Sequence, residues 1–109
     1  MKIENELHMK TYALHWLSTI GLRLKVARER RGITANKMAE ISFCDETAIE
    51  AIERGDENTK LADVIKVLTA LYLDKDVKGL ACPGDDDIGL FLEKYFRNSK
   101  IEVSDKFDF

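Results

Sequence analysis

The chain has 109 residues and a formal net charge of −3; 45% of its residues are hydrophobic, 34% are charged and one is proline. This size and composition are typical of one soluble, helix-rich domain with tails. No apolar run is long enough to span a membrane and the start, MKIENELHMK, is too polar for a signal peptide, so we expect a cytoplasmic protein. Cys44 and Cys82 are far apart in sequence and lack metal-type spacing, which favours a reduced compartment over a disulfide framework.

Residues 1–17 are interpreted as an N-terminal extension that is more apolar than a disordered tail, because it holds Leu7, Tyr12, Leu14, Trp16 and Leu17. The main domain is predicted over residues 18–81. Its first helix is expected to start at an N-cap on Ser18 or Thr19 and to end at Gly32. One face of that helix should carry Ile20, Leu24 and Ala27.

Three further helices are predicted before residue 72. Thr34 should cap a short helix that holds Met38 and Ala39, and Asp45 should cap the next one after a turn at residues 42–44. This third helix presents Ala48, Ile49 and Ile52 inward and ends at Gly55. The fourth, starting near Thr59, has a predicted buried stripe of Leu61, Val64, Ile65, Leu68 and Leu71.

The remaining residues are predicted to form a short fifth helix and a C-terminal extension, 82–109. Asp74 should cap the fifth helix, with Val77 and Leu80 facing the core. The aspartates of CPGDDD favour a helix N-terminus, and IGLFLEKYF is then an amphipathic helix. The final KIEVSDKFDF alternates apolar and polar residues, a weak strand signal that makes most sense if it pairs with another chain. We therefore expect this extension to contribute to a two-fold dimer.

The segments IGLRLKVARERRGIT, KMAEISFCDETAIEAIERG and LADVIKVLTALYL together resemble the helix-turn-helix domain of the XRE family, which includes Cro and the lambdoid phage repressors. The resemblance covers residues 20–80. It implies an all-α, five-helix, lambda-repressor-like fold, with the helix-turn-helix motif at about 34–54. It also implies a homodimer that binds double-stranded DNA, and an internal ion pair between Arg28 and Glu53.

The resemblance further implies which residues contact DNA. In relatives, the recognition helix presents its N-terminal residues to base edges in the major groove. The matching positions here are Glu46, Thr47, Glu50 and Ala51. Phosphate contacts are expected from a helix N-terminus and its neighbours, Thr34, Ala35, Asn36 and Lys37, and from the loop residues Arg54, Asn58 and Lys60.

Two features depart from the family pattern. Residues 40–57 contain seven acidic residues and a single basic residue, Arg54. Such a surface gains little free energy from counterion release on DNA. Phe43 stands where relatives place a small residue, often glycine, with positive φ. We expect a reshaped turn that points Ile41, rather than residue 42, inward; exposure of Phe43 to a partner is the alternative.

No residue pattern indicates catalysis, a cofactor or a metal site. His8 and His15 are interpreted as surface or interface residues, since no other ligand is near them in sequence. The sequence therefore favours a non-enzymatic, homodimeric DNA-binding repressor. The alternative is a protein-binding helix-turn-helix module or an antitoxin-like autoregulator, whose acidic helix and aromatic ends hold a toxin or another regulator.

Overall fold

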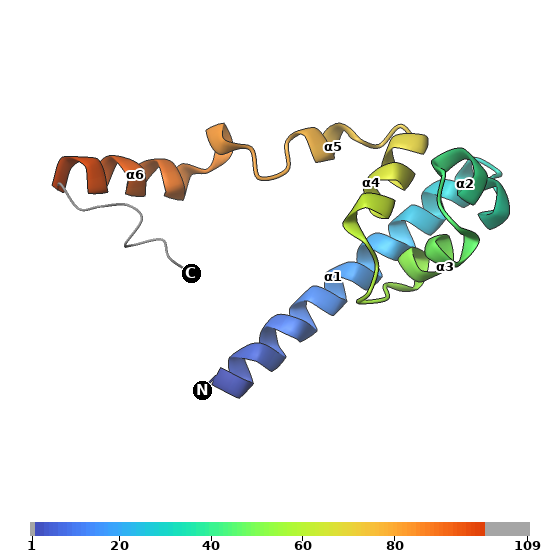
Figure 1. The fold of residues 1–109 in the computed structure, drawn as a ribbon, viewed down its shortest axis with the longest axis horizontal. Coiled ribbons are helices and arrows are strands. Elements are labelled where there is room, and N and C mark those ends of the chain that lie inside the picture. The colour runs from blue at the N-terminus through green and yellow to red at the C-terminus, as the bar shows by residue number, and fades with distance from the viewer. Residues whose placement is uncertain (1, 100–109) are drawn as a thin grey trace. The chain divides into compact units, whose positions relative to one another are not determined.

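The computed structural model describes residues 2–99, with side chains from residue 4 onward, and these residues are all-helical (Figure 1). The elements are α1 (Lys2–Arg30), α2 (Ala35–Ser42), α3 (Glu46–Arg54), α4 (Leu61–Ala70), α5 (Lys75–Lys78), the 3₁₀ turn η1 (Pro83–Asp85) and α6 (Asp87–Ser99). The predicted all-α class is thus confirmed for the described residues. The strand expected at the C-terminus lies outside them. The chain forms two compact units, one up to Lys75 and one from Asp76.

α1 is one continuous helix, so the predicted N-cap at Ser18 or Thr19 is wrong. The Thr19 hydroxyl instead donates to the carbonyl of His15 at 2.9 Å, which satisfies it inside the helix. The residues before it are mostly good helix formers, so nothing stops the helix there. Ile20 is 40% exposed, contrary to expectation, whereas Leu24 and Ala27 are buried as predicted.

The core of the first unit lies where α3 packs on α1 and α2, and α4 packs on α2. Its buried apolar residues are Leu24, Ala27, Met38, Ala39, Ile49, Ile52, Val67 and Leu71. Cys44 packs against this cluster from its margin. The stripe predicted for α4 is wrong at its start: Leu61, the first residue of the helix, is 64% exposed, and Val67 is buried instead.

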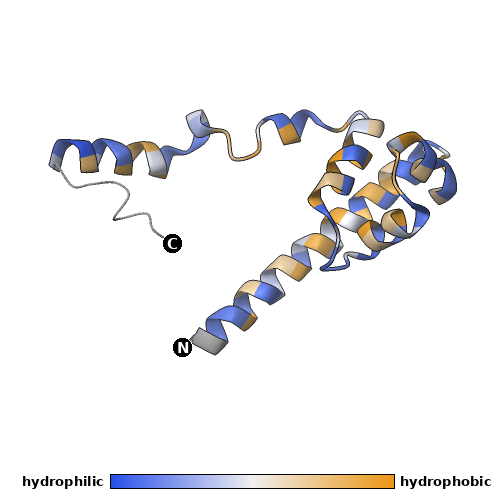
Figure 2. Cartoon of the chain, viewed as in Figure 1, coloured by the Kyte–Doolittle hydropathy of each residue, from blue (hydrophilic) through white to orange (hydrophobic). Residues whose placement is uncertain are grey.

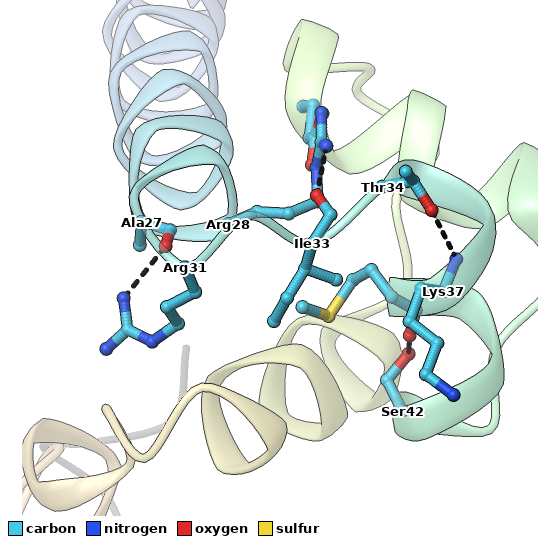
Figure 3. Close-up of polar contacts among 9 residues, drawn as sticks. Ala27, Arg28, Arg31, Ile33, Thr34, Lys37 and Ser42 are labelled. Atoms are coloured by element: carbon cyan, nitrogen blue, oxygen red, sulfur yellow. Dashed lines mark hydrogen bonds and ion pairs between the residues drawn. The ribbon is translucent and has the colours of Figure 1, made fainter.

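Polar contacts fix the loop between α1 and α2 (Figure 3). Thr34 is the predicted N-cap of α2, since its hydroxyl accepts from the backbone N–H of Lys37 at 3.1 Å. Arg31 donates to the carbonyl of Ala27 at 2.8 Å and to that of Leu71 at 3.0 Å. The loop therefore joins the end of α1 to the start of α2 and to the end of α4.

The turn between α2 and α3 keeps its strained geometry, so the expected reshaping is wrong. Ser42 is buried and donates to the carbonyl of Met38 at 2.6 Å, while Ile41 lies at the surface. Phe43 has φ 58° and ψ 41° and caps the C-terminus of α2. Its side chain is 87% exposed, so no packing offsets the cost of the left-handed backbone, about 1 kcal/mol or more.

The second unit contains η1 and α6. Asp86 accepts a hydrogen bond from the backbone N–H of Gly89 at 2.9 Å, so an aspartate caps the entry to α6 as the sequence suggested. Leu80 was predicted to face the core but is 66% exposed, because α5 has only four residues and ends before it.

Candidate nucleic-acid interface

Two glycines bring α3 against the middle of α1. A Cβ on Gly21 would overlap the carbonyl oxygen of Ile52 and lie 2.9 Å from that of Glu53. Gly55, with φ 74°, ends α3, and a Cβ there would lie 2.6 Å from the Cα of Ser18. Both positions therefore require glycine. Sequence reasoning found Gly55 as a helix end but missed Gly21, whose only signal is a glycine inside a helical pattern.

Arg28 and Glu53 form the ion pair that the family resemblance implies. The guanidinium donates from Nε to Glu53 Oε2 at 2.8 Å and from Nη2 to Oε1 at 3.0 Å. It also donates from Nη1 to the carbonyl of Ile33 at 2.7 Å. The hydrogen bond with Glu53 raises the pKa of Arg28 above its usual value, although partial burial opposes the shift. The pair locks α1, α3 and the loop before α2 in one geometry.

The outer face of α3 carries the predicted base-reading residues. Glu46, Thr47 and Glu50 are exposed, and Ala51 is half-buried. Thr47 and Ala51 line a shallow groove of about 260 Å³, which also contains Asn58 and Lys60. The structure thus brings two predicted base-reading residues beside two predicted phosphate contacts.

The same groove also holds polar residues for which the sequence predicted no contact with DNA. Asp45 and Asp63 contribute carboxylates to its lining. The hydroxyl of Thr59, another lining residue, is buried and has no hydrogen-bond partner among the described residues. A buried hydroxyl without a hydrogen-bond partner lowers the folding stability by about 1–3 kcal/mol. The Thr59 hydroxyl therefore has an unused hydrogen-bonding capacity at this part of the groove.

At the start of α2, the other predicted phosphate residues lie close to acidic side chains. Ala35 is half-buried at the first position of the helix, next to the Thr34 cap. Asn36 donates from Nδ2 to Glu46 Oε2 at 3.3 Å, and this bond connects α2 to the predicted base-reading helix. Lys37 forms an ion pair with Glu40 at 3.3 Å.

After α3, a local network surrounds Asp56. Its carboxylate accepts from the backbone N–H of Asn58 at 2.8 Å and from Arg54 at 3.1 Å. These contacts, with the backbone hydrogen bond as the larger cause, hold the pKa of Asp56 below its usual value. The side chain of Lys60, by contrast, forms no ion pair with the described residues.

The seven acidic residues between Glu40 and Glu57 fall into two groups, those with an ion-pair partner and those without one among the described residues. Four of the seven have cationic partners, in the pairs Lys37–Glu40, Arg28–Glu53, Arg54–Asp56 and Lys10–Glu57. Asp45, Glu46 and Glu50 form no ion pair within the described residues. The negative charge that remains is therefore concentrated at the N-terminal half of α3, on its outer face.

The histidines and cysteines of residues 4–99 are not gathered into one site. No group of three metal-binding side chains occurs among them, and both cysteines are free thiols. His8 and His15 are exposed, and His15 contacts the ring of Trp16 with centroids 5.3 Å apart. None of the described helices has the length and apolar character required to cross a bilayer.

Comparison of the chain with protein-family models and with curated proteins finds no match.

Proposed function

We propose that the chain is a sequence-specific DNA-binding transcription regulator of the XRE type, acting as a homodimeric repressor. In this proposal α2 and α3 are the two helices of a helix-turn-helix, and α3 enters the major groove. One observation carries it: α3 is held on α1 by the close contacts at Gly21 and at Gly55 and by the Arg28–Glu53 ion pair. In this position the side chains of Glu46, Thr47 and Glu50 face outward. A rigid helix with exposed polar residues at its N-terminal half suits base reading.

Phosphate contacts in the proposed complex come from helix N-termini and a few cations. The N-termini of α2 and α4 present backbone N–H groups, which bind anions well. Lys60 is the N-cap residue of α4, and its amine forms no ion pair with a carboxylate of the described residues. Lys37 and Arg54 do have partners, but their side chains are 56% and 63% exposed. Exposed pairs contribute only about 0–1 kcal/mol, so phosphate can replace the carboxylate at low cost.

The base-reading side chains are acceptors or small groups. A carboxylate accepts a hydrogen bond from cytosine N4, and threonine or alanine contacts the thymine methyl group. With Glu46 and Glu50 at the N-terminal half of α3, the proposal expects cytosines within each half-site. The unpaired acids also lower non-specific affinity, because they repel the backbone of any DNA sequence.

The test is selection of bound duplexes from a random pool at low and at moderate salt, followed by sequencing. The proposal expects an enriched inverted repeat. Glu50→Gln is the sharpest variant, since it preserves size but replaces a cytosine acceptor by a bidentate adenine reader. It should therefore change the selected base at one position of each half-site and leave the rest of the site unchanged.

Lys60→Ala tests the phosphate contacts. It should weaken binding to all sequences and reduce the salt slope by about one per protomer, without a change of preferred site. Lys66→Ala is the matched control, because Lys66 is exposed in the interior of α4, away from its N-terminus. Absence of any enriched sequence at both salt concentrations contradicts the proposal. So does a uniform effect of Glu50→Gln on every sequence.

A second function, binding of a protein by an antitoxin-like regulator, is favoured by two other observations. Asp45, Glu46 and Glu50 form an acidic face that has no ion pair with the described residues, and Phe43 is almost fully exposed in spite of its strained backbone. These features suit a basic partner with an apolar pocket. This function becomes the better one if duplex selection fails while the protein remains folded.

A further inference from the structure

α1 carries an apolar stripe that its own domain covers only in part. Met9, Tyr12, Trp16 and Ile20 are spaced by three, four and four residues, which places them on one face of a helix. Their exposed fractions are 69%, 61%, 39% and 40%. At 3.6 residues per turn the centre of this face lies roughly 135° from Gly21, which packs on α3. The same face continues into the core at its C-terminal end, where Ala27 is buried, so it is the part from Met9 to Ile20 that remains exposed.

The side chains of the stripe are already ordered against one another. The rings of Tyr12 and Trp16 meet edge to face, with centroids 6.4 Å apart, and the guanidinium of Arg23 lies 5.8 Å from the Trp16 ring. Figure 1 shows that the N-terminal half of α1 extends beyond α2, α3 and α4, and Figure 2 shows apolar residues along it. A helix that leaves its domain depends on other packing for stability, since isolated helices of about 12–15 residues are marginal in water.

We propose that this stripe is a dimer interface, distinct from the C-terminal extension that the sequence also predicts to contribute to a dimer, and that α1 of a second copy packs on it antiparallel about a two-fold axis. The stripe is self-complementary in this orientation. Positions whose numbers add to about 29 lie opposite each other, so Met9 meets Ile20 of the second copy and Tyr12 lies beside its Trp16. Ala13, near the axis, leaves room for the large rings.

The charges at the two ends of the stripe support this occupant and this direction. Glu6 lies before the stripe, whereas Arg23, whose guanidinium lies against the Trp16 ring, follows its other end. Antiparallel pairing places Glu6 opposite Arg23 of the second copy. Parallel pairing places each residue beside its own equivalent, and so brings like charges together.

The available area fits a dimer. Each of the four stripe side chains exposes roughly 100 Å², given that a whole aromatic side chain buries about 150–250 Å². Two copies then bury about 800 Å² of apolar surface. The stems of the flanking charged residues bring the total to about 1,000 Å², the lower limit of a specific interface.

The first experiment measures the mass of the full chain by sedimentation equilibrium, without DNA. The wild type should be a dimer at micromolar concentration. Tyr12→Glu places two charges in the interface and should weaken dimerisation by about 100-fold or more. Leu22→Glu is the matched control: Leu22 is 60% exposed on the same helix but lies off the stripe, so its variant should remain dimeric. Circular dichroism of both variants checks that α1 is intact.

The second experiment tests the antiparallel direction. Glu6→Arg and Arg23→Glu should each weaken the dimer by about 5- to 10-fold, and the double variant should restore most of the affinity. A monomeric wild type overturns the proposal, and so do equal effects of Tyr12→Glu and Leu22→Glu. Failure of the charge exchange to restore affinity overturns the antiparallel pairing. The inference names the interface of the homodimer in the proposed function, but it is measured without DNA. A dimer that selects no duplex would therefore contradict the function alone.

Discussion

The Arg28–Glu53 pair offers the sharpest test of how the α1–α3 junction is held. Arg28→Met removes both hydrogen bonds to Glu53 and the one to the carbonyl of Ile33. It leaves the Glu53 carboxylate without a countercharge, and only 13% of that side chain is exposed. Breaking a buried pair from one side costs about 3–5 kcal/mol. Because some solvent reaches Glu53, we expect the lower end, about 3 kcal/mol, which is a large share of a typical domain stability of about 5–15 kcal/mol.

The assay is urea unfolding followed by circular dichroism, applied to a double-mutant cycle of Arg28→Met and Glu53→Leu. The double variant removes both charges, so it should be about 2 kcal/mol more stable than the sum of the two single losses predicts. Lys37→Met is the control, because the pair of Lys37 with Glu40 is exposed and should contribute less than about 1 kcal/mol. Additive losses in the cycle would refute the reasoning, since they would show that the two charges do not stabilise each other.

Three further predictions concern single residues. Gly21→Ala should destabilise the fold by about 2 kcal/mol or more, because the clash with the α3 carbonyls outweighs the gain of up to about 1 kcal/mol in helix propensity. Unchanged stability in urea unfolding would show that α1 and α3 lie farther apart. Phe43→Gly should raise stability by up to about 1 kcal/mol, because it relieves the positive φ and loses little packing; a lower denaturation midpoint would contradict this. The folded pKa of Asp56 lies below its unfolded value of about 3.9, so its contribution to the free energy of unfolding is present above about pH 4 and is lost as the pH falls further. Asp56→Asn should therefore flatten the decline of stability below about pH 4, as measured by urea unfolding at a series of pH values.

Features that depend on neighbours in the chain could be read from the sequence alone. The Thr34 cap and the helix end at Gly55 involve a hydrogen bond or a backbone conformation within a few residues, so residue type was enough to place them. Asp45 occupies the predicted N-cap position of α3, but its side chain forms no capping hydrogen bond. Most of the core residues on α2 and α3 followed from helical spacing. The same local reasoning failed at Ser18 and Thr19, because a hydroxyl that can cap a helix can also bond back to the preceding turn and let the helix continue.

Tertiary structure decided which other side chains are neutralised and which helices touch. The family resemblance implied the Arg28–Glu53 pair, but no sequence pattern indicated that Glu57 pairs with Lys10 or that Asn36 bonds to Glu46. Only folding brings those partners together, so sequence counting exaggerated the charge on α3. The requirement for glycine at position 21 has the same origin, since the clashing carbonyls belong to a helix about thirty residues away. Local sequence determines helix ends and stripes because those interactions are short-range, whereas ion pairs and close helix contacts depend on distances that exist only in the folded chain.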